Sequence, residues 1–146
     1  MQRPPEYDNL IKTGYFHEVA PTHGYKEQYL KVAQAYLTDA NQATTAASRY
    51  LLSYEAYYQL VQAVLEHFGV RTSDRQGHRI VAIQRVSCDL DLTAGELKLI
   101  MDFHHRRNES VYRAPLPPIS LQEAHAMHEL AKKTFISATQ KISSIS

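Results

Sequence analysis

The feature of this chain that most limits its fold is an apolar pattern of helical period between residues 45 and 68. Large apolar side chains recur there every three or four positions, which places them on one face of a helix; they are Tyr50, Tyr54, Tyr57, Val61, Val64 and Phe68. Gly69 follows directly and suits the left-handed residue that ends many helices. The pattern predicts a long, apolar helix from about Thr45 to Phe68 at the centre of the core.

Shorter patterns of the same period predict four further helices. One precedes the central helix and another follows it from about Asp74 to Cys88. Two capping boxes, in which a hydroxyl and a glutamate three positions later satisfy each other's backbone N–H groups, begin the last two helices at Thr93 and Ser120. The expected inward residues are Leu30, Ala33, Leu37 and Ala40; Ile80, Ile83 and Val86; Leu97, Ile100, Met101 and His104; and Leu121, Ala124, Met127, Leu130 or Ala131, and Phe135.

The two ends of the chain lack such patterns. Prolines and glycines interrupt residues 1–24, which predicts an irregular arm with one helical turn near Asp8 to Lys12. The Ser-rich residues 143–146 are expected to fray. No strand pattern of useful length is visible. The sequence therefore predicts one all-α domain over residues 25–142, a bundle of about five helices with short loops.

Composition limits the function classes. A chain of 146 residues with net charge +1 can build one core, and it gives no overall electrostatic argument for binding a nucleic-acid duplex, although a local basic site is compatible with it. The single Cys88 excludes an intramolecular disulfide, and its apolar neighbours predict a small buried hydrophobe. No apolar run reaches the ~20 residues that cross a bilayer. We expect a soluble, cytoplasmic protein without a membrane partner.

Polar side chains are concentrated at the end of the fourth predicted helix, just before a proline-rich stretch. This segment reads His104-His105-Arg106-Arg107-Asn108-Glu109-Ser110-Val111-Tyr112-Arg113. An Arg-Asn pair can bind a phosphate. The alternative is ordinary helix-end chemistry, because arginine favours the negative end of the helix dipole and asparagine suits the stop.

A second basic group, Arg71, Arg75 and Arg79, has a spacing of four. It is either the solvated face at the start of a helix or one wall of an anion or RNA groove. In the second case Arg106, Arg107 and Arg113 would form the other wall, and their phosphate contacts would give affinity without sequence choice.

The order of these segments resembles a known family. The long helix reads Arg49-Tyr50-Leu51-Leu52-Ser53-Tyr54-Glu55-Ala56-Tyr57-Tyr58, and Phe68-Gly69-Val70-Arg71 leads from it to a polar, His-containing stretch, a late Arg-Asn and a final helix. This is similar to the HEPN superfamily (higher eukaryotes and prokaryotes nucleotide-binding), small helical domains of toxin–antitoxin, phage-defence and RNA-processing systems. The resemblance covers residues 26 to 142.

Ribonuclease members of that family carry an arginine followed four to six residues later by a histidine. Arg107-Asn108 matches the opening of the motif, but Tyr112 stands where the histidine would be. The resemblance implies that Arg107 stabilises a pentacovalent phosphate, that Asn108 orients it, and that Tyr112 either positions a 2′-hydroxyl or donates to a leaving oxygen. Tyrosine, with a pKa of ~10, is a poor proton carrier near neutral pH.

Two histidines precede the arginine by about one helical turn. Either His104 or His105 stands in for the missing imidazole, or one packs in the core and the other is solvated, since neighbouring residues point in different directions. Glu55, between tyrosines, is a candidate for a partly buried polar contact behind the motif; an exposed glutamate is the alternative.

Two functions follow from the resemblance. The first is a homodimer that acts on or binds RNA in a shared basic cleft, as a metal-independent endoribonuclease of toxin or defence type. The second is a non-catalytic module that binds RNA, a nucleotide or a protein partner such as a nucleotidyltransferase or an antitoxin. No cofactor is expected, and no metal, because His125 and His128 are only two ligands.

Overall fold

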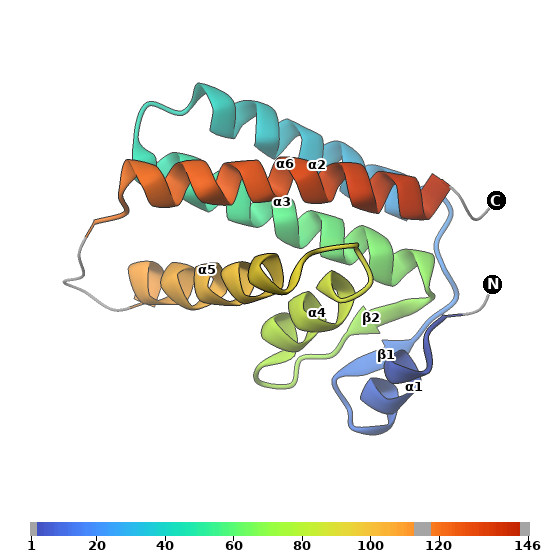
Figure 1. The fold of residues 1–146 in the computed structure, drawn as a ribbon. Coiled ribbons are helices and arrows are strands. Elements are labelled where there is room, and N and C mark those ends of the chain that lie inside the picture. Colours follow the sequence, from blue (N-terminus) through green and yellow to red (C-terminus); the bar gives the residue numbers. More distant parts are fainter. Residues whose placement is uncertain (1–2, 113–117, 144–146) are drawn as a thin grey trace.

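The computed structural model describes residues 3–112 and 118–143. Across these ranges the chain forms six helices and two short strands (Figure 1). In chain order they are α1 (Pro5–Lys12), β1 (Phe16–Glu18), α2 (Tyr25–Gln42), α3 (Ala46–His67), β2 (Val70–Thr72), α4 (His78–Ser87), α5 (Ala94–Tyr112) and α6 (Leu121–Ser143). Helices α2, α3 and α6 run side by side, and α4 and α5 pack against another side of α3.

The central helix α3 follows the prediction to within one residue at each end. Thr45 is its N-cap and accepts a hydrogen bond from the Ser48 backbone N–H at 3.1 Å. Gly69 after its C-terminus has φ +73°, and a Cβ there would lie 3.1 Å from the Val19 carbonyl oxygen. Many side chains of α3 are fully buried, Leu60 among them. They lie where α3 packs against α2, α6 and the shorter elements.

Both capping boxes are confirmed. The Thr93 N–H donates to Glu96 at 2.9 Å and the Glu96 N–H to the Thr93 hydroxyl at 3.1 Å. The corresponding distances between Ser120 and Glu123 are both 3.0 Å. These two pairs begin α5 and α6, which bring the polar segment of α5 back against the bundle.

The described residues form the predicted all-α helical bundle, with six helices where about five were expected. The prediction of an irregular arm differs from the structure in the first 24 residues. The predicted turn is the eight-residue helix α1, and β1 pairs antiparallel with β2, Phe16 opposite Thr72. Tyr7 is fully buried and its hydroxyl donates to Asp89 Oδ2 at 2.8 Å. Two three-residue strands are too short to show a period, and tertiary pairing stabilises them.

Two burial predictions are also wrong. Leu121 is 73% exposed because it begins α6, ahead of Ala124, the first buried residue of that helix. Cys88 is exposed at the C-cap of α4, beside a surface hollow shared with α1. In the part of the chain that the structure describes, no helix is long and apolar enough to cross a membrane.

Candidate functional site

Three helices bring one glutamate and two arginines together. Glu55 of α3 accepts hydrogen bonds on Oε1 from Arg79 Nη1 of α4 at 3.2 Å and from Arg107 Nη2 of α5 at 3.1 Å. We call these three residues the arginine cluster. The side chains of Glu55, Arg79 and Arg107 are 29%, 30% and 17% exposed, so solvent reaches all three. Two positive charges and one negative charge leave a single positive charge in excess.

Two buried tyrosines of α3 form the floor of the arginine cluster. The Arg79 guanidinium lies 4.0 Å from the ring centroid of Tyr58, and that of Arg107 lies 5.3 Å from the centroid of Tyr54. Tyr54 is fully buried and Tyr58 is 5% exposed. Contacts of this kind attract the cations and hold their planes in fixed positions. From the sequence, these tyrosines are expected to be core residues. Their positions on either side of Glu55 in the chain were the signal for a role in the site.

A chain of hydrogen bonds orients Arg107 from within α5. Arg107 Nη1 lies 3.3 Å from Asn108 Oδ1, and because arginine only donates, this oxygen accepts. The amide nitrogen of Asn108 then donates to His104 Nε2 at 3.2 Å, which leaves that nitrogen without a proton. The neutral ring therefore carries its proton on Nδ1 and donates it to the Tyr54 hydroxyl at 2.8 Å.

His104 is a positioning residue in this chain. Burial, with smaller contributions from His105, Arg79 and Arg107, lowers the pKa of His104 to about 4. The ring is thus neutral at pH 7, and both of its nitrogens are occupied. Burial also raises the pKa of Tyr54 to about 12, against the opposing effect of the two arginines. His104 is 5% exposed and His105 is exposed, so one packs in the core and the other is solvated.

The remaining residues of the motif segment are placed as follows. Arg106 donates to Glu123 at 2.9 Å and to the Pro118 carbonyl at 3.2 Å, which ties the end of α5 to the start of α6. The backbone of Tyr112 ends α5. Its side chain and the whole of Arg113 lie outside the described residues.

The second basic group does not form one wall with the motif segment. Arg71 lies in β2, where it pairs with Glu66 at 3.2 Å. Arg75 lies before α4, donates to the Thr13 carbonyl and covers the Tyr15 ring at 4.3 Å. Of these three arginines, only Arg79 shares the Glu55 carboxylate with Arg107. The spacing of four was not a helical spacing, because α4 begins at His78, after two of the three arginines.

Among the residues that the structure describes, no three histidine, cysteine, aspartate or glutamate side chains are grouped to hold a metal ion. His125 is exposed and His128 is 6% exposed, on α6.

No family model matches the chain, and no curated protein matches it either.

Proposed function

We propose that this chain is an HEPN-like domain that binds RNA through the arginine cluster. The observation that carries the proposal is the convergence of Arg79 and Arg107, from two helices, on one oxygen of Glu55, with Arg107 held by Asn108. Arginine bound to a carboxylate in this way has the fork of donors that also suits a phosphate. An RNA phosphate would compete with Glu55 for the same guanidinium groups.

Binding is better supported than cleavage. Metal-independent cleavage of RNA requires a group that takes and gives a proton near neutral pH. The histidine in hydrogen-bonding contact with the motif, His104, has its pKa lowered to about 4 and both nitrogens engaged. Arg107 and Asn108 retain a role in binding a phosphate group, with His104 holding them in place.

The proposal includes a homodimer in which the α5 ends of two copies face each other. Leu121 is 73% exposed and follows Ser120, at the corner where Arg106 ties α5 to α6. An exposed leucine beside the polar segment is the kind of residue that a protein interface covers. A dimer formed there would place two arginine clusters along one surface.

The test is the affinity for a fluorescent single-stranded RNA, measured by anisotropy at several salt concentrations. Arg107→Ala is expected to weaken binding about tenfold or more, because hydrogen bonds to charged groups contribute ~1.5–3 kcal/mol. The slope of log affinity against log salt should fall by about 0.7 for the lost phosphate contact. Glu55→Gln, which removes the competing carboxylate, should strengthen binding at low salt.

Lys98→Ala provides the matched control, since it removes a positive charge from the same helix at a side chain that is 79% exposed. Binding too weak to detect in the wild-type protein, or equal losses in Arg107→Ala and Lys98→Ala, would contradict the proposal. Incubation of the metal-free protein with total RNA adds the catalytic question. Cleavage that Arg107→Ala abolishes would make the domain a ribonuclease as well.

A further inference from the structure

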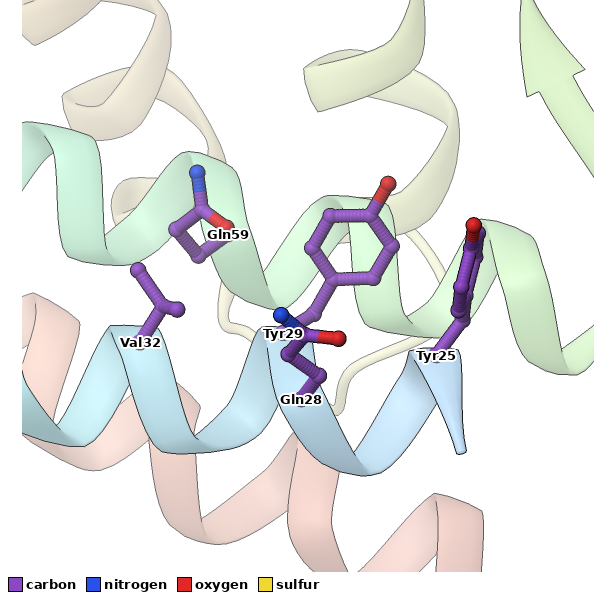
Figure 2. Close-up of a pocket in the computed structure, with 5 residues that line it drawn as sticks. All are labelled: Tyr25, Gln28, Tyr29, Val32 and Gln59. Atoms are coloured by element: carbon purple, nitrogen blue, oxygen red, sulfur yellow. The ribbon is translucent and has the colours of Figure 1, made fainter. Parts of the chain in front are cut away.

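A pocket between α2 and α3 has the side chains that recognise an aromatic ring with polar edges. It is an open pocket of about 250 Å³, lined by Tyr25, Gln28, Tyr29, Val32 and Gln59. Figure 2 shows the four α2 side chains extending from α2 on the side next to α3, which carries Gln59. Tyr25 is 41% exposed, one of the few large apolar side chains that the described surface leaves open. The volume lies just below the ~300–1,000 Å³ range of pockets for drug-sized ligands, which suits a single base.

This pocket and the arginine cluster are neighbours on α3. Glu55 and Gln59 are four positions apart on the helix, so they share a face and are separated by about 6 Å along the axis. Gln62 and Glu66 continue the same face. We call Glu55, Gln59, Gln62 and Glu66 the α3 strip. Its length from Glu55 to Glu66 is about 16 Å.

The α3 strip has two arginines at one end and one at the other. Arg79 and Arg107 bind Glu55 at one end. At the other end Arg71 of β2 binds Glu66, and its guanidinium lies 5.4 Å from the ring centroid of Tyr25. The Arg71 side chain is 40% exposed. The tyrosine pocket therefore lies between two places where a guanidinium could bind a phosphate.

We propose that the pocket takes one nucleobase of a single-stranded RNA whose flanking phosphates lie on the arginine cluster and on Arg71. The inference rests on the proposed function and adds the kind of RNA. Tyrosine rings stack on any base, and the two glutamine amides can donate to and accept from its edge. In a duplex the bases are stacked and paired, so the pocket selects single strands.

The experiment compares a short single-stranded RNA, an identical strand with abasic sites and an RNA duplex. Tyr29→Leu and Tyr25→Leu are expected to weaken binding of the base-containing strand at least fivefold each. They should leave the abasic strand and the duplex unchanged within twofold. Tyr29→Phe keeps the ring and should bind the base-containing strand within twofold of wild type. A 2-aminopurine base in the strand should lose fluorescence on binding wild-type protein by stacking, but not on binding Tyr29→Leu.

Tyr36→Leu is the matched control, since Tyr36 is a partly buried tyrosine of the same helix outside the pocket. Thermal unfolding of each variant checks that it folds. If the two pocket variants bind all three RNAs like wild type while Arg107→Ala weakens binding, the pocket is refuted and the proposed function stands. If the pocket variants lose affinity and Arg107→Ala does not, the pocket stands without the arginine cluster. A wild-type protein that binds no RNA refutes both.

Discussion

Burial of His104 makes the stability of the protein depend on pH. Its pKa falls from 6.5 to about 4 on folding, so between these values the unfolded chain binds a proton that the folded chain does not. The contribution of His104 to stability is therefore complete above pH 6.5 and is lost as the pH falls towards 4. We expect the free energy of unfolding to drop by about 2–3 kcal/mol over this window on account of this residue.

Urea unfolding of wild type and His104→Gln between pH 7.5 and 4.5 measures the effect. The variant should show the smaller decrease, with a remainder from His67 and His128, whose pKa values burial also lowers. Glutamates whose pKa the fold lowers from 4.5, such as Glu66, also lose stabilisation as the pH falls towards 4.5, but they do so equally in both proteins, so the difference between the two profiles isolates His104. Identical pH profiles for the two proteins would show that His104 is not buried as a neutral ring in solution.

At the scale of elements, the docking of α1 depends on Tyr7. Its ring lies 5.0 Å from that of Phe68, and its hydroxyl donates to Asp89. We expect Tyr7→Ala to lower the free energy of unfolding by about 3–5 kcal/mol, as for other buried aromatic residues. Tyr7→Phe should cost about 1–2 kcal/mol, because it keeps the ring and leaves one carboxylate bond unmade.

Chemical denaturation followed by circular dichroism gives both values for Tyr7. Tyr15→Ala is a suitable control, since Tyr15 directly precedes β1 and is only partly buried. A loss below 1 kcal/mol for Tyr7→Ala would mean that α1 is not docked on the bundle.

Elements with a long period or a capping box could be predicted from the sequence. The bounds of α3 and the starts of α5 and α6 are of this kind, because local residues determine them. The strands β1 and β2 could not, since each has three residues and gains its bonds from the other. Their pairing is a tertiary effect that no local pattern records.

The candidate site was predictable in part for the same reason. Arg107, Asn108 and Glu55 stood out by their residue types and neighbours. The hydrogen bond between His104 and Asn108 follows from their spacing of four on α5. The neutral state of the His104 ring in that bond depends on its burial beside Tyr54, which is a tertiary contact. The separation of Arg79 from Arg71 and Arg75 required the true start of α4, which lies four residues after the predicted Asp74.

At the scale of the whole molecule, the proposed homodimer makes Leu121 an interface residue. Light scattering of the wild-type protein at micromolar concentration should give twice the monomer mass of 16.7 kDa. Leu121→Glu should give the monomer, because it places a charge at the centre of an apolar contact. Both proteins should show the same helical circular dichroism.

Ile136→Glu is the matched control for this prediction, since Ile136 is 58% exposed on the same helix but far along it from Leu121. It should remain a dimer. A wild-type monomer would remove the dimer from the proposed function, and a dimer broken only by Ile136→Glu would move the interface to the other end of α6.

The pairing of β1 with β2 also bears on how the chain reaches its native state. Glu18 and Val70 are 52 positions apart, whereas α2 and α3 are joined directly by residues 43–45. Closing a longer loop costs more chain entropy, so local contacts form more readily than distant ones. We therefore expect the hairpin of α2 and α3 to form early and the N-terminal segment, α1 and β1, to join last. A folding intermediate without that segment would expose Phe68 and Val70, and this apolar surface is where newly made chains would aggregate first.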